Sequence, residues 1–485
     1  MLRKSLLTKG FVSIVLIIIL CCSSASSISV MSSSYQNTYY VDDDNIEGPW
    51  NGTIEHPFQH IQDAIDVASD GDMVFVYSGI YYEQLMIDKS ISLQGEDKNS
   101  TVIDGDTLFD VVYISANTTI ITGFTITNAK YGHISEGETG IHIRSSNNLI
   151  MDNILIDNKV GIYIQVLDSN NTIEQNIFKD NGLGMKLRFT SYTVVENNTF
   201  IDNYWGMRLE YVVRIDISDN RIIGQFVEGL RLEGAYSCNI SMNHLVLDGV
   251  SVQGMILDSS CSNSIHGNYF ENMKNAGRGI FFTWTSNGNI VEKNDIKNFY
   301  GGICLFAGSS ENVIKGNIIR ENSKGINFES AECNDNTISE NTIINNTQYG
   351  IYFTYEEYGN SFYHNNFLNN QNHANNKGDN SWDNGWKGNY WDDYESRYPD
   401  ARKTLRGTWN MPYDVDDNNV DRYPLIKMYS HAKVTLMNRL WQLFPDGHIL
   451  KNLVFQTYLQ FQKIHDKNTY LPMKPMSVLI TFSSY

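Results

Sequence analysis

Proline, cysteine and basic residues are scarce in this chain. Only 8 of its 485 residues are proline and 6 are cysteine, which excludes collagen-like, proline-rich and disulfide-dense architectures. Lysine and arginine total 36 against 55 acidic residues, so the formal net charge is −19. Such a surface repels phosphate backbones and anionic lipids, and we therefore predict no nucleic-acid partner. The 41% hydrophobic and 12% aromatic residues exclude a wholly disordered chain.

The first 25 residues predict an export signal. Arg3, Lys4 and Lys9 precede an apolar run over residues 11–22, and small residues follow it. The run is shorter than the roughly 20 residues that span a bilayer, so residues 1–25 are predicted as a signal peptide, with an uncleaved anchor as the alternative. The protein is then secreted or on the cell surface. Sequons typical of an exported glycoprotein occur at Asn51, Asn99, Asn117, Asn170, Asn197, Asn239 and Asn345.

Asparagine is abundant, and it recurs with a period of about 24 residues. In the first half of each repeat, the motif apolar-x-x-Asn-x-apolar places it at Asn153, Asn176, Asn198, Asn220, Asn243, Asn268, Asn294, Asn317, Asn341 and Asn365. The second half carries the motif Gly-apolar-x-apolar, from Gly140 to Gly350. Apolar residues alternate within each half, which is the pattern of a short strand with one buried face.

This repeat predicts an all-β solenoid, a parallel β-helix with coils of 22–26 residues stacked about 4.8 Å apart. We expect the stacked asparagines to form a ladder of side-chain amides, and glycine to stand where the coil bends with positive φ. A second ladder is expected two residues before each leading apolar residue, with Cys238 in one of its places. Its asparagines are Asn148, Asn171, Asn263, Asn289, Asn312, Asn336 and Asn360.

An open solenoid end needs a cover, and residues 56–65 predict a helix there, with Pro57 in its first turn. Its apolar stripe consists of Ile61, Ala64, Ile65 and Ala68. The resulting division is a β-helix with its N-terminal cap over residues 39–370 and a Trp/Tyr/Asp-rich closing segment over residues 371–428. We expect residues 431–485 to form a short helical tail of unknown role, with docking on the β-helix end and contact with a membrane as alternatives.

Three motifs carry a family resemblance: Tyr39-Tyr40-Val41-Asp42, Pro57-Phe58-x-x-Ile61-Gln62-x-Ala64-Ile65 and Asn389-Tyr390-Trp391-Asp392-Asp393-Tyr394. Together with the coils, they resemble archaeal right-handed parallel β-helix proteins of the NosD-like type, which have a pectin-lyase-like fold. The resemblance covers about four-fifths of the chain. It implies repeats named for carbohydrate binding and sugar hydrolysis, and the name-giving member is a periplasmic accessory of copper-site maturation.

The chain departs from this family at residues 401–410. The family usually carries an Asp/Gly-rich, calcium-like turn there, whereas this chain has Arg402, Lys403 and Arg406. This departure puts a calcium site in doubt.

The outward positions of the Gly-apolar-x-apolar strands predict one exposed face with a candidate site. The basic and aromatic residues expected to bind a substrate are Lys186, Arg188, Arg208, Arg231, Tyr163, Phe281 and Phe306. Glu210, Glu233 and Asp258 follow on successive coils and are the candidate catalytic residues. Their spacing of one or two coils spans the carboxylate separations of retaining and inverting glycosidases. Two carboxylates this close would also raise one pKa, as a general acid requires.

Three interpretations of this face stay open. It is a solvated sheet decorated with charge pairs, a groove that binds a polysaccharide or surface glycan, or the site of a polysaccharide lyase, glycoside hydrolase or epimerase. We expect glycan binding, with the catalytic protein and a structural surface protein without ligand as alternatives.

The sequence predicts no cofactor and no metal site. His56 and His60 lie four residues apart near the predicted helix but have no third ligand at a recognisable spacing. Copper is not carried over from the family name, because the 15 methionines are scattered. Cys238 and Cys261 are one coil apart and could bridge, but buried free thiols are the preferred interpretation. The oligomeric state stays open.

Overall fold

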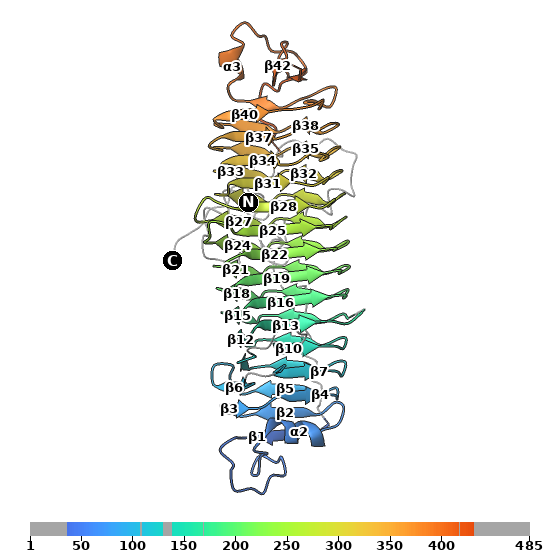
Figure 1. The fold of residues 1–485 in the computed structure, drawn as a ribbon, viewed down its shortest axis with the longest axis vertical. Coiled ribbons are helices and arrows are strands. Elements are labelled where there is room, and N and C mark those ends of the chain that lie inside the picture. Colours follow the sequence, from blue (N-terminus) through green and yellow to red (C-terminus); the bar gives the residue numbers. More distant parts are fainter. Residues whose placement is uncertain (1–35, 107–108, 130–137, 168, 417, 431–485) are drawn as a thin grey trace, which may run out of the picture. The chain divides into compact units, whose positions relative to one another are not determined.

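The computed structural model describes residues 36–106, 109–129, 138–167, 169–416 and 418–430. It consists of three long parallel sheets, to which each coil contributes one strand in turn, and it is a right-handed parallel β-helix (Figure 1). Within these residues, no helix is long and apolar enough to cross a membrane. The predicted signal peptide and the predicted tail at residues 431–485 lie outside the described residues.

The first sheet has 14 strands. They are β1 Thr38–Val41, β2 Met73–Val76, β5 Ser92–Gly95, β8 Ile120–Thr122, β11 Leu149–Met151, β14 Thr172–Glu174, β17 Val194–Glu196, β20 Asp216–Ser218, β23 Asn239–Ser241, β26 Ser264–His266, β29 Ile290–Glu292, β32 Val313–Lys315, β35 Thr337–Ser339 and β38 Ser361–Tyr363.

The second sheet also has 14 strands. They are β3 Gly79–Tyr82, β6 Thr101–Asp104, β9 Thr125–Thr127, β12 Ile154–Ile156, β15 Ile177–Lys179, β18 Thr199–Ile201, β21 Arg221–Ile223, β24 His244–Leu247, β27 Tyr269–Asn272, β30 Asp295–Lys297, β33 Ile318–Arg320, β36 Thr342–Ile344, β39 Asn366–Leu368 and β41 Tyr390–Trp391.

The third sheet has 13 strands and contains the Gly-apolar-x-apolar motifs. They are β4 Leu85–Ile87, β7 Val112–Ile114, β10 Thr139–Ile143, β13 Val160–Ile164, β16 Leu183–Arg188, β19 Trp205–Glu210, β22 Glu228–Glu233, β25 Gln253–Asp258, β28 Arg278–Thr283, β31 Gly301–Leu305, β34 Lys324–Phe328, β37 Tyr349–Phe353 and β40 Asn372–Asn375.

The core is made of columns of equivalent side chains in register. Ile150 pairs with Ile173 and Ile173 with Val195, and all three are fully buried. Phe178 and Phe200 stack with their ring centroids 4.4 Å apart. Each residue of a column touches its equivalents one coil away, so the alternation of apolar residues in the sequence becomes one continuous core.

The predicted asparagine ladder is confirmed. Nδ2 of Asn176 donates to Oδ1 of Asn198 at 3.1 Å and to the carbonyl of Ile150 at 2.8 Å, and Asn198 repeats the pattern toward Asn220. The second ladder is present too, and the backbone N–H of Cys238 donates to Oδ1 of Asn263 at 2.9 Å. Through these ladders, buried asparagine amides are hydrogen-bonded from one coil to the next.

A third ladder, between the second and third sheets, was not predicted. Asn181 donates through Nδ2 to Oδ1 of Asn203 at 2.9 Å and to the carbonyl of Leu155. The same arrangement returns from Asn322 to Asn346 and Asn370. Gln225 and Phe299 stand in this ladder elsewhere, which hides the period in the sequence.

The repeated glycines are needed for a different reason from the one expected. Gly206 lies in a strand, and a Cβ there would be 2.2 Å from the carbonyl oxygen of Gly229 on the next coil. The left-handed corners are occupied mainly by other residues, such as Asp202 and Asn197, at φ of 53° and 55°. The prediction of positive φ at the repeated glycines is therefore wrong, and close approach of successive coils explains them.

The N-terminal cap is the helix α2, Ile61–Val67. It begins at Ile61, so Pro57 precedes it and the predicted start was too early. Glu83 accepts hydrogen bonds from the first two backbone N–H groups of the helix, at 2.8 and 2.9 Å, and this contact from another coil fixes its beginning. The predicted stripe Ile61, Ala64, Ile65 and Ala68 is buried against the first coil.

The opposite end is closed by residues that follow the last coils. The short helix α3, Tyr394–Arg397, precedes the antiparallel pair β42, Tyr413–Asp414, and β43, Val420–Asp421. Tyr413 stacks on Trp391 at 4.1 Å, and the buried carboxylate of Asp421 accepts the indole N–H of Trp391 at 2.9 Å. Aromatic rings thus cover the open end of the core.

Candidate functional site

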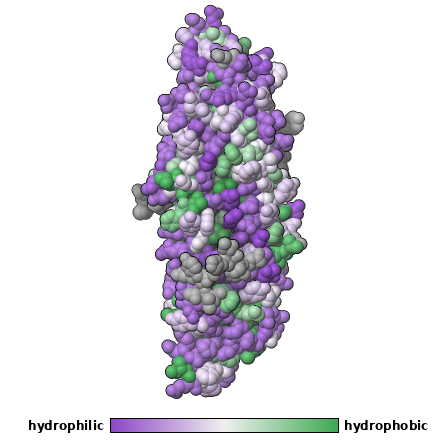
Figure 2. Space-filling model, in the orientation of Figure 1, coloured by the Kyte–Doolittle hydropathy of each residue, from purple (hydrophilic) through white to green (hydrophobic). Residues whose placement is uncertain are grey.

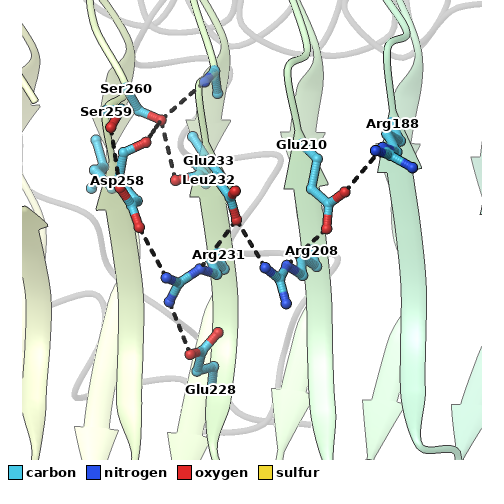
Figure 3. A network of polar contacts seen from close by, with 12 residues as sticks. Arg188, Arg208, Glu210, Glu228, Arg231, Leu232, Glu233, Asp258, Ser259 and Ser260 are labelled. Carbon is cyan, nitrogen blue, oxygen red and sulfur yellow. Dashed lines mark hydrogen bonds and ion pairs between the residues drawn. The ribbon is translucent and has the colours of Figure 1, made fainter. Parts of the chain in front are cut away.

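The candidate residues of the third sheet lie in two adjacent columns. Lys186, Arg208 and Arg231 are paired in register on β16, β19 and β22, and the second column is Arg188, Glu210, Glu233 and Asp258. The parallel register therefore brings the predicted basic and acidic residues together, as Figure 3 shows.

Glu210 has the most cationic surroundings of the three carboxylates. Its side chain is 11% exposed and lies 3.4 Å from Nζ of Lys186, 3.3 Å from Nε of Arg188 and 3.0 Å from Nε of Arg208. Three cationic side chains thus surround this one carboxylate, which accepts their contacts from the two neighbouring strands β16 and β19.

Arginine side chains separate the successive carboxylates. Arg208 donates from Nη2 to Glu233 at 2.8 Å, and Arg231 donates to Asp258 at 3.0 Å and to Glu228 at 3.1 Å (Figure 3). Burial lowers the pKa of Arg208, but its hydrogen bond to Glu233 and the charge of Glu210 raise it by more. Burial raises the pKa of Glu228, against the opposing charge of Arg231.

Two rows of exposed aromatic rings flank this charge network, and the sequence analysis did not predict them. One row stands where β19 and β22 begin: Tyr204 packs edge-on against Trp205 at 4.4 Å and lies 6.4 Å from Phe226. At the other end of the strands, Phe189 and Tyr211 stack at 5.4 Å. In both rows the stacked rings are one repeat apart, and this period is the signal that could have revealed them. In Figure 2, hydrophobic residues interrupt the hydrophilic surface in the middle of the view.

The three aromatic residues that the sequence predicted take no part in the two rows of exposed rings. Tyr163 is only 4% exposed, because His142 stacks on its ring at 5.0 Å and Lys186 lies 5.4 Å from the ring centroid. Phe281 and Phe306 contact each other at 6.1 Å, beyond β25, and Arg278 lies over Phe281. The expectation of an exposed face is wrong at Tyr163 and at the candidate catalytic residue Glu210, which is 8% exposed over the whole residue, because neighbouring side chains cover both.

The four described cysteines are all free, so Cys238 and Cys261 form no disulfide. Cys304, in the outward column of the third sheet, is fully buried. Arg278, on β28, and Glu329, directly after β34, form a bidentate ion pair, with Nη2 to Oε2 at 2.7 Å. Cys304 lies on β31, the strand between these two. Burial raises the pKa of the Cys304 thiol well above its usual value.

His56 and His60 do not share a helical face, because α2 begins at Ile61. Nδ1 of His60 lies 3.6 Å from a single carboxylate oxygen, of Glu83. These two histidines therefore lack the helical spacing on which a shared metal site would depend.

A family described as "Periplasmic copper-binding protein (NosD)" matches residues 65–278 and 254–396 of the chain. No curated protein sequence matches this chain. Among solved structures, the Dettilon tailspike protein is 16% identical, with a TM-score of 0.48 over 71% of this chain and 68% of that one.

Two other solved structures are also 16% identical. The A-module of the mannuronan C-5 epimerase AlgE6 from Azotobacter vinelandii has a TM-score of 0.39, over 67% of this chain and 93% of that one. The PL6 family alginate lyase AlyGC has a TM-score of 0.40, over 68% and 49%. At this level of similarity, these structures say nothing about the ligand of this chain.

The described residues do not provide the sulfur-rich donor set that copper favours. Met185, Met207 and Met255 are buried in core columns. The three-ligand group of histidine and acidic side chains in the described part of the chain, centred on His373, contains no sulfur.

Proposed function

The chain belongs to the NosD family, and we propose that it is an exported β-helix protein that binds a glycan across strands β16, β19, β22 and β25. The observation that carries this proposal is the charge network between two rows of exposed aromatic rings. Sugars present apolar faces that stack on aromatic rings and hydroxyl groups that bond to charged side chains. The same face offers both kinds of contact within a few coils.

Exposure of the rings supports binding. Tyr204, Phe226 and Tyr211 are 49%, 65% and 51% exposed. Exposure of large aromatic side chains to water is unfavourable, because it forgoes the free energy of burying them. Exposed aromatic residues next to arginine are typical of surfaces that bind a partner. A solvated sheet that only needed charges to prevent aggregation would not need these rings.

The charge pattern favours binding over catalysis. A glycosidase needs one carboxyl group free to donate a proton, whereas Glu210, Glu233 and Asp258 are each in an ion pair with arginine. These paired side chains hold one another in place and can form directional hydrogen bonds to a ligand with little loss of side-chain entropy.

Catalysis on the same face is the alternative, and one observation favours it. Burial raises the pKa of Glu228, and this residue shares Arg231 with Asp258. Glu228 and Asp258 would then be the acid and its partner, with Glu210 and Glu233 holding the arginines. Release of reducing ends or of unsaturated products from a polysaccharide panel would distinguish an enzyme from a binding protein.

Export is supported by the positions of the sequons. Six of the seven sequon asparagines are exposed, and Asn239 is half-buried. Three of them, Asn170, Asn197 and Asn345, directly precede an asparagine of a ladder, so these sequons follow from the repeat. An exported protein would carry glycans on these exposed positions of its coils and not on the ladder residues.

Binding can be tested by affinity electrophoresis in gels that contain neutral or acidic polysaccharides. We expect Arg208→Ala, Phe226→Ala and Tyr211→Ala each to weaken the affinity measured from retardation about fivefold, since a stacking or charged contact contributes about 1 kcal/mol. Arg320→Ala is the matched control, because Arg320 pairs with Asp295 at 2.9 Å on the second sheet. Equal retardation of the wild type and the three site variants in every retarding gel would refute glycan binding at this face.

A further inference from the structure

The C-terminal end of the β-helix gathers one histidine and two aspartates. His373 belongs to β40, Asp392 directly follows β41, and Asp393 precedes α3. Nε2 of His373 lies 2.8 Å from Oδ1 of Asp392 and 3.4 Å from Oδ1 of Asp393. Each residue has a ligand atom within 4.8 Å of the other two, and no other group of this kind occurs in the described part of the chain.

The second oxygen of each carboxylate is already held by the protein. Oδ2 of Asp392 accepts the backbone N–H of Asn369 at 2.6 Å, and Oδ2 of Asp393 accepts the hydroxyl of Tyr413 at 3.2 Å. Oδ1 of Asp393 is buried and accepts no hydrogen bond from the residues described. One oxygen of each aspartate is therefore fixed, and the other is directed at the space beside His373. This is how supporting contacts orient metal ligands.

His373 is held in place as well. Its side chain is 8% exposed and lies beside the stacked rings of Phe367 and Trp391, whose centroids are 6.0 and 5.9 Å away. Its Nδ1 is 3.5 Å from Nδ2 of Asn370, the last asparagine of the third ladder. The amide nitrogen of Asn370 can only donate, so Nδ1 accepts and Nε2 carries the ring proton, directed at Oδ1 of Asp392; a bound ion would take the place of this proton.

We propose that His373, Asp392 and Asp393 bind a divalent cation such as Zn²⁺ or Mn²⁺. Two ligand atoms, each about 2.1 Å from an ion, are about 3.0 Å apart in octahedral and about 3.4 Å apart in tetrahedral coordination. The separations of 2.8 and 3.4 Å here need only small adjustments. One imidazole nitrogen and two carboxylate oxygens form a donor set without sulfur, which suits these ions better than Cu⁺. Two carboxylates also supply the charge that neutralises a divalent ion.

The site joins the last strand of the third sheet to the closing segment. One ligand comes from β40, and the other two are the adjacent residues between β41 and α3, so the bound ion cross-links the closing segment to the final coil. Metal binding then stabilises the closure of the β-helix, independently of any ligand on the third sheet.

Zinc alone is the probe for this site. We expect calorimetric titration of the chelator-treated full chain with ZnCl₂ to show one binding site more in the wild type than in His373→Gln. Zinc should also raise the Tm of the wild type but not that of His373→Gln. Asp393→Asn should weaken that site ten- to hundredfold. His60→Gln is the control, because His60 faces the single carboxylate of Glu83 and its loss should leave zinc binding unchanged.

The metal-free Tm and circular dichroism of each variant show whether it folds. Both His373→Gln and Asp393→Asn roughly preserve the size of the side chain. Only variants that fold are used to judge the proposal, and Asp392→Asn is a third variant in case one of these two does not fold. Zinc binding by these folded variants with the stoichiometry and affinity of the wild type would overturn the proposal. A site lost in the folded variants and retained in His60→Gln supports it.

Discussion

Nη2 of Arg208, on β19, lies 2.8 Å from Oε2 of Glu233, on β22, one coil further along the chain. The same guanidinium contacts Glu210 on its own strand at 3.0 Å. Arg208 therefore stands between two carboxylates that the parallel register would otherwise bring side by side. Its positive charge links the two coils through these ion pairs.

Removal of this arginine should expose the repulsion between its neighbours. We expect Arg208→Ala to lower the free energy of unfolding by about 1 kcal/mol at pH 7, because Glu210 and Glu233 then face each other on successive coils. At about 1 M salt the repulsion between the carboxylates is screened, and the variant should approach the wild type. Urea unfolding at low and high salt measures the difference.

The double variant Arg208→Ala/Glu233→Gln checks this account. It removes the second charge as well, and should recover part of the lost stability at pH 7. If the double variant is less stable than Arg208→Ala, repulsion is not the cause.

The asparagine ladder should tolerate very little change. Asn198 is buried and donates from Nδ2 to Ile173, Glu196 and Asn220, so Asn198→Ala leaves several buried groups unpaired. We expect a loss of about 3 kcal/mol or more in the free energy of unfolding. Asn197→Asp, at the exposed neighbouring position with φ of 55°, should change it by less than about 0.5 kcal/mol. Similar losses in both variants would contradict a special role for the ladder.

The repeated glycines should be sensitive to one added carbon atom. Gly206→Ala places a Cβ 2.2 Å from the carbonyl oxygen of Gly229, so two coils must separate. We expect the free energy of unfolding to fall by about 3 kcal/mol or more. Gly385→Ala is the contrasting variant, since Gly385 has φ of 87° but nothing within 4 Å of an added Cβ. Its loss should be limited to about 1–2 kcal/mol of backbone strain. A smaller effect at Gly206 than at Gly385 would show that coil spacing is not the constraint.

A buried carboxyl group should make stability depend on pH. Burial raises the pKa of Glu357 from its ordinary 4.5 to about 7, although the backbone N–H of Cys333 donates to it at 2.8 Å. Because the folded pKa is the higher one, the stabilising contribution is complete below pH 4.5 and is lost as the pH rises through 7. Glu357→Gln should remove this dependence and exceed the wild type by up to about 3 kcal/mol at pH 8.

Thermal unfolding from pH 4 to 8 provides the measurement for Glu357. The exposed neighbour Glu356 gives the control, and Glu356→Gln should follow the wild-type curve. Parallel curves for the wild type and Glu357→Gln would contradict a raised pKa at this position.

The sequence predicted what the repeat dictates. The columns from Lys186 to Arg231 and from Arg188 to Asp258 follow from a period of one coil, because equivalent residues of a parallel solenoid must be neighbours. The pairing of Arg278 with Glu329 skips a coil, so the period does not reveal it. The contact of His373 with Asp392 depends on the closing segment, which has no repeat. The start of α2 depends on Glu83, a distant contact that local helix signals do not contain.

Within the coils, strands pair only with strands of the coils directly before and after, and the two caps lie at the ends. A duplicated coil would therefore find the same partners above and below, and both caps would stay intact. The third sheet can in this way gain strands by duplication, or lose them by deletion, in steps of one repeat. Its length is then a property that selection can adjust without redesigning the core.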